Sequence, residues 1–251
     1  MIMLKEERQQ EILKIINSEQ KVIASDLSHR LSVSEDTIRR DLKDLDNKGL
    51  IRRVHSGALR LGPPLEDFSI REKVFSDIKM SLAQKALPFI KDDQVLLIDG
   101  GTTNLCLTKQ LPINLKATVI TNSPPIAVAL ANHKQIEVIM LGGTLNKKSM
   151  INVGIDTVEA LSTMRVDIYI MGIYNIDSQI GVSCPTLSEC LTKRKMVSIS
   201  SEIIALVTSD KLGTVSNQVV CPPQDLSYLI TDSISSEIKN LYSRQNITVI
   251  D

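Results

Sequence analysis

Three loops rich in glycine and hydroxyl side chains directly follow aliphatic runs of the sequence. They are DGGTTN (99–104), TNS (121–123) and GGT (142–144). Gly100 and Gly101 let backbone N–H groups point to one side, Thr102 and Thr103 add hydroxyl groups, and a helix that begins there favours an anion. Ligands bind at the carboxyl ends of the strands in open α/β sheets. The loops therefore predict a phosphate-binding site, although each loop alone would also serve as a tight turn.

Polar side chains in and near these loops are candidates for contacts with the rest of a ligand. Asp99 ends an aliphatic run and could accept a sugar hydroxyl or merely cap the next helix. Asn122 is both a donor and an acceptor but also a common turn residue, and Asn104 and Thr121 occupy similar positions. Lys211, in TSDKLG, follows another aliphatic run and could reach a phosphate, although the sequence alone favours a solvated lysine.

These loops are positioned by alternating strands and helices. Seven runs rich in Ile and Val are predicted strands: 94–99, 117–121, 136–141, 166–172, 203–208, 226–231 and 246–250. Most of them show no polar alternation, which is typical of strands covered on both faces. Segments of helical length lie between most of them: 76–90, 103–111, 124–132, 157–164, 187–201 and 233–242. This rhythm predicts an α/β domain with an open, largely parallel sheet over residues 76–251.

Arginine and lysine are concentrated in a second region, residues 31–58, which could bind a polyanion. Ser34 can cap a helix there whose buried stripe is Ile38, Leu42 and Leu45. The side chains on or beside the opposite face are Asp36, Thr37, Arg39, Arg40 and Lys43. A shorter helix precedes it, with Ser25 as the expected N-cap. A short helix, a tight turn and a helix with an outward row of basic residues predict a helix-turn-helix that reads the major groove of DNA.

A hairpin is expected to follow the basic helix. After Gly49, LIRRVHSGALRL alternates well enough for a two-stranded wing, which places Arg52, Arg53 and His55 beside DNA phosphates. The alternative for the region is a solvated amphipathic helix, because acidic residues could pair with its cations. Those acids are Asp36, Asp41, Asp44 and Asp46. Charge alone does not decide between the two interpretations.

Composition limits the class of protein. The 251 residues carry 29 basic and 29 acidic side chains, with a net charge of +2 in residues 1–61 and −2 in the remainder. Gly62 and the two prolines after it predict a linker over residues 62–75, between an N-terminal domain (1–61) and the α/β domain. No run is apolar enough for a membrane helix, and no signal-peptide pattern begins the chain. Four scattered cysteines match no metal motif. We expect a cytoplasmic protein without a metal or other cofactor.

The basic block resembles the winged helix of the DeoR-type family of bacterial sugar-metabolism repressors, whose pattern is approximately VS..TIRRDL..L...G...R.HGGA. The matching residues are Val33, Ser34, Thr37, Ile38, Arg39, Arg40, Asp41, Leu42, Leu45, Gly49, Arg53, His55, Gly57 and Ala58, with Ser56 in place of a glycine. The blocks LLIDGGTTNLCL, VITNSPPIAVAL, VIMLGGTLNKKSMINVG and SDKLG resemble the C-terminal domain of the same family. That domain shares its fold with ribose-5-phosphate isomerase.

This resemblance implies that the C-terminal domain binds a phosphorylated sugar or a related metabolite. By position, the effector-binding residues would be Asp99, Gly101, Thr102, Thr103, Asn122, Gly142, Gly143 and Lys211, and Asp177, Glu189 and Lys193 match more loosely. The family usually has an aspartate three residues before the position of Lys211, where this chain has Thr208. That departure indicates altered effector selectivity.

We therefore expect a transcriptional regulator, foremost a repressor, that binds an operator in double-stranded DNA as a homodimer or homotetramer and is not an enzyme. The alternative is a sugar-phosphate isomerase with an accessory helical domain. Asp177, Glu189 and Lys193 would then supply a base and stabilise the enediolate. A third possibility is that the N-terminal helices only mediate protein contacts, which would leave the Arg39–Arg40 motif unexplained.

Overall fold

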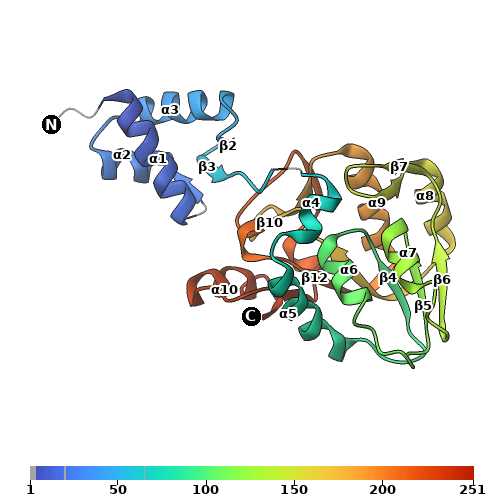
Figure 1. The fold of residues 1–251 in the computed structure, drawn as a ribbon. Coiled ribbons are helices and arrows are strands. Elements are labelled where there is room, and N and C mark those ends of the chain that lie inside the picture. Colours follow the sequence, from blue (N-terminus) through green and yellow to red (C-terminus); the bar gives the residue numbers. More distant parts are fainter. Residues whose placement is uncertain (1–3, 20, 65) are drawn as a thin grey trace.

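The computed structural model describes residues 4–19, 21–64 and 66–251, which form a small N-terminal domain and a larger α/β domain (Figure 1). The N-terminal elements are α1 (Lys5–Glu19), β1 (Lys21–Ile23), α2 (Ala24–Leu31), α3 (Glu35–Asn47), β2 (Ile51–Val54) and β3 (Gly57–Arg60). The three strands form one sheet in the order β1-β3-β2. The expected hairpin wing is therefore present, and β1 extends it by a third strand.

The three helices of this domain share one apolar core. Ile38, Leu42 and Leu45 of α3 are buried, as their spacing predicts, and they pack with residues of α1 and α2. Ser34 caps α3, since its Oγ accepts a hydrogen bond from the Thr37 N–H at 3.2 Å. The expectation for Ser25 is wrong, because α2 begins one residue earlier and its first N–H, that of Ala24, donates to the Ser56 carbonyl at 2.9 Å.

The sheet holds the wing close to the helices. In the β2–β3 hairpin, Arg53 pairs with Ala58 and Val54 with Gly57. Gly57 also faces β1, where a Cβ atom would lie 1.9 Å from the Val22 carbonyl oxygen. A glycine is therefore required here for the backbones to approach each other. Ser56, the departure from the family pattern, has a negative φ and needs no glycine.

All seven predicted strands are present and form one parallel sheet. They are β4 (Val95–Ile98), β5 (Ala117–Thr121), β6 (Ile136–Met140), β9 (Val166–Gly172), β12 (Ser200–Leu206), β14 (Tyr228–Ile230) and β15 (Thr248–Ile250). Their order is β15-β14-β12-β9-β4-β5-β6. The chain therefore starts at β4, builds outward through β5 and β6, and then returns to β9 on the other side of β4. The order in which the chain adds strands to the sheet thus reverses between β4 and β9, and this position is here called the reversal point.

Both faces of this sheet are buried. Leu97, Tyr169 and Ile203 belong to one apolar cluster, whereas their neighbours Leu96 and Ile168 belong to another on the opposite face. The covering helices are α5 (Ser76–Ala86), α6 (Thr102–Thr108), α7 (Pro124–Leu130), α8 (Ile155–Ala160), α9 (Leu187–Ser198) and α10 (Ser236–Ser243). Double coverage explains why the strand sequences lack polar alternation.

Several elements were not expected from the sequence. They are α4 (Phe68–Lys73), the hairpin β7 (Thr144–Asn146) and β8 (Ile151–Val153), the antiparallel strands β10 (Asn175–Asp177), β11 (Gly181–Cys184) and β13 (Gln218–Cys221), and the 3-10 turns η1 (Leu87–Phe89), η2 (Leu161–Thr163), η3 (Ser209–Lys211) and η4 (Pro223–Asp225). A linker was expected over residues 62–75. Its described parts, residues 62–64 and 66–75, lie against the α/β domain, and Phe68 is buried in the core of that domain. Among the described helices, none is long and apolar enough to cross a membrane.

Candidate ligand pocket and nucleic-acid interface

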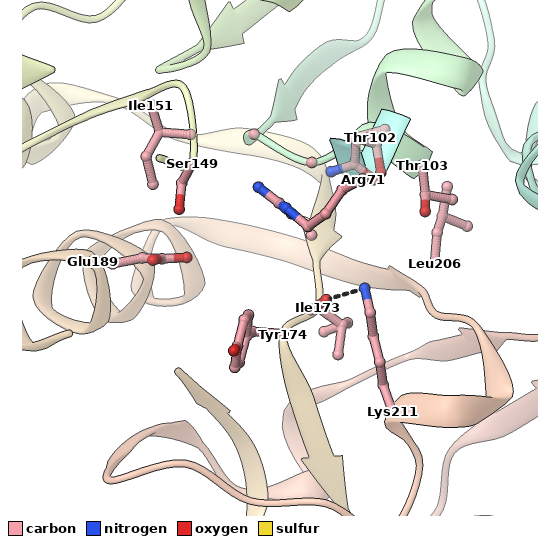
Figure 2. Close-up of a pocket in the computed structure, with 14 residues that line it drawn as sticks. Arg71, Thr102, Thr103, Ser149, Ile151, Ile173, Tyr174, Glu189, Leu206 and Lys211 are labelled. Atoms are coloured by element: carbon pink, nitrogen blue, oxygen red, sulfur yellow. Dashed lines mark hydrogen bonds between the residues drawn. The ribbon is translucent and has the colours of Figure 1, made fainter. Parts of the chain in front are cut away.

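A pocket lies at the carboxyl ends of β4 and β9, at the reversal point of the strand order. This is the position at which open α/β sheets bind ligands. The side chains in Figure 2 come from the loops after β4, β9 and β12, from the β7–β8 hairpin, from α9 and from α4. The predicted site residues that line the pocket are Gly100, Gly101, Thr102, Thr103, Asn104, Glu189 and Lys211. Of the three predicted loops, only the one after β4 lines the pocket, where it meets Lys211 from the loop after β12.

Asp99 and Lys193 lie beside this pocket rather than in its lining. The Asp99 carboxylate accepts hydrogen bonds from Tyr169 Oη at 2.6 Å, Gly172 N at 2.5 Å and Asn104 Nδ2 at 3.0 Å, and it pairs with Lys193 Nζ. Both members of the ion pair are almost fully buried. Because these donors occupy the carboxylate, Asp99 neither caps the next helix through its side chain nor offers a free acceptor to a sugar hydroxyl. The pair instead fixes the ends of β4 and β9.

Gly172 makes this close junction possible. A Cβ atom at this position would lie 2.3 Å from the Gly100 carbonyl oxygen and 2.9 Å from Asp99 Oδ1. The Gly172 carbonyl oxygen also accepts a hydrogen bond from Lys193 Nζ at 2.7 Å. The end of β9 thus approaches the glycine loop after β4 as closely as the backbone permits.

Five further predicted residues do not line the pocket, which corrects that part of the expectation. They are Thr121, Asn122, Gly142, Gly143 and Asp177. The first four lie at or just after the ends of β5 and β6, on the far side of β4 from the reversal point. Asn122 has an indirect role, since its Nδ2 donates to the Asn152 carbonyl at 2.9 Å and so holds the strand that carries Ile151. Asp177 accepts hydrogen bonds from the N–H groups of residues 179 and 180 and closes the β10–β11 turn.

Seven residues of the lining were missed by sequence reasoning. They are Arg71, Ser149, Ile151, Gly172, Ile173, Tyr174 and Leu206. Arg71 belongs to the segment expected to be a linker, and Ser149 and Ile151 belong to a hairpin that the strand pattern did not predict. Tyr174 follows a predicted strand by two residues, so the rule that ligands bind at strand ends could have found it. Nothing in the spacing of Arg71 distinguishes it from a solvated arginine.

The pocket combines cations with a buried carboxyl group whose pKa is raised, and this combination favours an anion. Burial lowers the pKa of Lys211 to about 8, assisted by repulsion from Arg71, Lys79 and Lys193 and opposed by attraction to Asp210. Burial also raises the pKa of Glu189, with repulsion from Asp99 adding to the effect while Lys193 and Arg71 oppose it. Lys211 Nζ donates to the Ile173 carbonyl at 2.8 Å and retains two further protons. An anion that enters the pocket would therefore meet cations that the nearby carboxylates do not fully neutralise.

Of the three residues considered for isomerase chemistry, Glu189 and Lys193 lie one turn apart on α9. Glu189 lines the pocket, whereas Lys193 pairs with Asp99, and Asp177 closes the β10–β11 turn outside the lining. Among the described residues, no group of three or more His, Cys, Asp or Glu side chains could hold a metal ion. The pocket presents hydrogen-bond donors and cations that suit a polar, anionic molecule.

The exposed face of α3 carries fewer free cations than its sequence suggests. Arg40 pairs with Asp36 at 2.5 Å and Arg39 with Glu35 at 2.5 Å, each across one helical turn. Lys43 is exposed and has no ion pair with another described residue. Exposed pairs of this kind contribute little stability, about 0.3–0.5 kcal/mol, so DNA can displace the acid at small cost. Both arginines thus remain available to bases or phosphates.

The other three acids of α3 lie away from that face. Asp41 is buried and pairs with Arg8 of α1 at 2.5 Å, and Asp44 pairs with Lys5 at 2.6 Å. Asp46 accepts a hydrogen bond from the Arg53 N–H at 3.0 Å and so ties the wing to the helix. These contacts remove the electrostatic objection to DNA binding, because the offsetting charges serve the packing of the domain.

The remaining predicted residues surround the same face. Ser34 and Thr37 stand at the start of α3, where their hydroxyl oxygens are 2.8 Å apart. Arg53 and His55 of the wing are exposed. Arg52 is partly buried, and its Nε has no partner among the described atoms. A recognition helix flanked by a basic wing is the layout of a winged helix-turn-helix.

Together, the two sites define a ligand-responsive DNA-binding protein, with a helix-turn-helix joined to an α/β sensor domain. Comparison with known proteins agrees. The DeoR-like helix-turn-helix domain matches residues 8–62, and the DeoR C terminal sensor domain matches residues 75–233, more than half of the chain. The chain belongs to the DeoR family of transcriptional regulators.

Individual proteins are similar along nearly the whole chain. The HTH-type transcriptional repressor GlcR of Bacillus subtilis is 31% identical over 94% of this chain and 91% of its own length. The L-fucose operon activator of Escherichia coli is 28% identical over 91% and 96%, respectively. Among solved structures, ribose 5 phosphate isomerase A from Neisseria gonorrhoeae aligns over 54% of this chain and 53% of its own, with a TM-score of 0.40 and 16% identity.

Proposed function

We propose that this regulator represses genes of carbohydrate metabolism and that a phosphorylated sugar, bound in the α/β pocket, controls its affinity for DNA. The observation that carries the proposal is the pairing of two incompletely neutralised cations, Arg71 and Lys211, with the hydroxyl-rich loop that contains Thr102 and Thr103. Membership of a family with a dedicated sensor domain supports the regulatory role. Action on an operator implies that the protein works in the cytoplasm.

A phosphate group accounts for the basic part of the pocket. Phosphate oxygens accept hydrogen bonds from guanidinium, ammonium, hydroxyl and backbone N–H donors, all of which the pocket supplies. Thr208 stands where the family pattern has an aspartate, so the loop of Lys211 brings one carboxylate fewer than usual. The missing charge favours a more anionic effector than a neutral sugar.

The hydroxyl groups of a sugar would donate hydrogen bonds to the acceptor oxygens of the pocket, which belong to Glu189 and Asn104. The Glu189 carboxyl group lines the pocket, and Asn104 Oδ1 is buried there without a hydrogen-bond partner among the described residues. Unpaired buried acceptors cost about 1–3 kcal/mol each, so a ligand that donates to them gains affinity. A polyhydroxylated phosphate offers both complementary parts.

A thermal-shift screen tests the effector class. Pentose and hexose phosphates would be compared with the same sugars lacking phosphate, since a ligand that binds the native state raises the melting temperature. We expect at least one phosphorylated compound to stabilise the protein, its parent sugar to have no effect, and Lys211→Gln to abolish the shift. Stabilisation by parent sugars with equal strength would contradict the assignment of a phosphate site.

The DNA-binding role is tested with an operator recovered from a pool of random duplexes. A helix-turn-helix protein that binds as a dimer selects half-sites about 34–36 Å apart or at multiples of that spacing, so the recovered sequence should be a pseudo-palindrome. Analytical ultracentrifugation on the same sample distinguishes a homodimer from a homotetramer. A recovered site with a single half-site would contradict the proposed homo-oligomer on DNA.

A reporter assay in cells tests whether the protein represses or activates transcription. A reporter gene placed behind the recovered operator should be silent when the protein is present and active when its effector accumulates. Reporter expression that requires the protein would instead identify an activator and overturn repression while leaving the sensor assignment intact.

A further inference from the structure

Residues 62–64 and 66–75, here called the strap, connect the two domains and lie directly against the ligand pocket. Tyr174, a pocket residue, donates a hydrogen bond from Oη to the Pro63 carbonyl at 3.1 Å. The Phe68 N–H donates to the Lys148 carbonyl at 3.0 Å, and Lys79 Nζ donates to the carbonyls of Arg71 and Val74, to the latter at 2.6 Å. The strap is therefore held at several points by the sensor domain.

Arg71 projects from the strap into the pocket. Figure 2 shows its guanidinium between Thr102 and the side of the pocket that carries Glu189. Its Nε donates to the Glu66 carbonyl at 3.0 Å, and its terminal nitrogens have no hydrogen-bond partner within the described chain. Burial lowers the pKa of Arg71, and attraction to Glu189 only partly opposes the effect. A partly desolvated guanidinium with free donors is well suited to bind a phosphate oxygen pair.

The strap also closes a second chamber of about 330 Å³ beside the first. Its walls include the strap residues Pro63, Pro64, Val74 and Phe75, and it shares Arg71, Thr102, Tyr174 and Lys211 with the ligand pocket. Arg71 and its neighbours thus stand at the boundary of the two chambers. A ligand that engages Arg71 necessarily touches the connection to the DNA-binding domain.

A second contact links the pocket loop to the wing. Arg60, the last residue of β3, donates a hydrogen bond to the Asp210 carbonyl and forms a parallel bridge with Thr214. Asp210 immediately precedes Lys211 in η3. Through this contact, a displacement of the loop that carries Lys211 acts directly on the strand that belongs to the DNA-binding wing.

From these contacts we propose that the strap is a movable wall of the effector site, with Arg71 binding the anionic group of the effector. Through the contacts Tyr174–Pro63 and Arg60–Asp210, a change in the position of the strap then changes the position of the wing. The proposal rests on the proposed sensing of a phosphorylated compound and adds the residue and route by which binding reaches DNA. The Arg71 guanidinium is held by the Glu66 carbonyl and lies over the Phe68 ring, 5.8 Å from its centroid, so it is positioned with its terminal nitrogens unbonded to any described residue.

Inorganic phosphate serves as the probe for the anion-binding step. The melting temperature of the full chain would be followed against phosphate concentration, with chloride at equal ionic strength as reference. We expect Arg71→Gln to weaken the apparent phosphate affinity about tenfold or more, since charge-assisted hydrogen bonds are lost. Lys73→Gln, which removes the same charge from an exposed position of the same helix, should leave the affinity unchanged.

Lys211→Gln separates this proposal from the function on which it rests. If Lys211→Gln abolishes the phosphate effect and Arg71→Gln retains it fully, the effector site stands and the role of Arg71 is refuted. If the unmodified protein shows no phosphate effect, both are refuted. Arg71→Lys, which keeps the charge and loses the planar fork, should fall between the unmodified protein and Arg71→Gln.

Hydrogen exchange measured by mass spectrometry tests the moving wall. Phosphate should slow exchange in peptides covering the strap and alter exchange in the wing, residues 51–60. Arg71→Gln should lose both effects, and Arg60→Gln should lose only the effect on the wing. Phosphate binding that leaves strap exchange unchanged in the unmodified protein would overturn the proposal, because occupancy would then not reach the connection between the domains.

Discussion

At the scale of single residues, Lys211 illustrates how the fold alters an ordinary side chain. Its sequence context favours a solvated lysine, yet the loop after β12 buries its amine among Arg71, Lys79 and Lys193. The pKa falls to about 8, so the charge needed for anion binding is present at pH 7 and mostly absent at pH 9. The affinity for a phosphorylated effector should therefore depend on pH in a range where the phosphate itself is already dianionic.

Lys211→Arg tests this pH dependence. In the unmodified protein we expect effector affinity to fall about tenfold between pH 7 and pH 9, because only the protonated amine binds and its pKa in the empty protein is about 8. Arginine stays charged, so the variant should show a flat profile over the same range. Calorimetric titration at several pH values measures it, and a parallel decline in the variant would contradict the role of Lys211.

Arg40 and Arg53 are predicted to contribute differently to DNA binding. Arg40 lies on the exposed face of α3, and losing a base contact costs about 1–3 kcal/mol, so Arg40→Ala should weaken operator binding tenfold or more and random DNA little. Arg53 of the wing is exposed and is predicted to contact phosphates, so Arg53→Ala should weaken both equally and reduce the salt dependence. Fluorescence anisotropy on both duplexes measures the ratio, and equal losses for Arg40→Ala would refute base contact.

At the scale of elements, the sequence predicted long buried strands and amphipathic helices well and the small connecting structures poorly. The seven aliphatic runs became the seven strands of the parallel sheet because uniform apolarity and short length determine a doubly covered strand. Short pieces such as β7 and β10 have three residues each, too few for a period to be visible. Helix α4 follows a proline pair that correctly signals a break and says nothing of what comes next.

Gly57→Ala tests the packing of β1 on the wing. The added methyl group would meet the Val22 carbonyl oxygen, which belongs to the backbone and must shift. We expect a loss of about 1–3 kcal/mol in the free energy of unfolding of the N-terminal domain, measured with urea. Gly142→Ala is the matched control, since no atom lies within 4 Å of its added Cβ, and it should change stability by less than about 0.5 kcal/mol.

The strap makes a further prediction at this scale. Tyr174→Phe removes the hydroxyl that donates to Pro63 and keeps the ring beside the pocket. The ratio of DNA affinities without and with a saturating effector should move toward one, because the pocket and the strap become uncoupled. Anisotropy titrations on the recovered operator measure this ratio, and an unchanged ratio would show that the hydrogen bond transmits nothing.

At the scale of the whole molecule, a chain with a net charge of zero forms two domains with separate cores. The apolar cluster of the N-terminal domain shares no residue with the two clusters that cover the sheet. Side-chain contact between the domains is limited in the described residues to points such as Lys21 Nζ to Gln179 Oε1, at 2.5 Å, and Arg60 to Asp210. Separate cores joined by few contacts unfold in separate steps.

Differential scanning calorimetry should therefore show two transitions. A stabilising sugar phosphate at one hundred times its Kd adds about 2.7 kcal/mol to the state that binds it. For a domain of this size that corresponds to a rise of about 5–10 °C in the transition of the α/β domain. The transition of the N-terminal domain should move less, and equal shifts in both would contradict the separation of the cores.

The sequence by itself determined the parts that depend on local patterns. The spacing of Ile38, Leu42 and Leu45, the cap at Ser34 and the seven apolar runs specify their elements because helical and strand periods are properties of the nearby chain. The loop from Gly100 to Thr103 was recognised for the same reason, since it directly follows a strand.

Only the tertiary structure decided which loops meet. The strand order places β9 beside β4 at the reversal point and β12 next to β9, whereas β6 lies two strands from β4 on the other side. Tyr174 and Lys211 therefore line the pocket, while Gly142 and Gly143 do not. The tertiary structure also makes Asp99 and Lys193 a buried ion pair and brings Arg71 from the strap into the lining of the pocket. Side chains distant in sequence become neighbours through packing, and no period in the sequence encodes that choice.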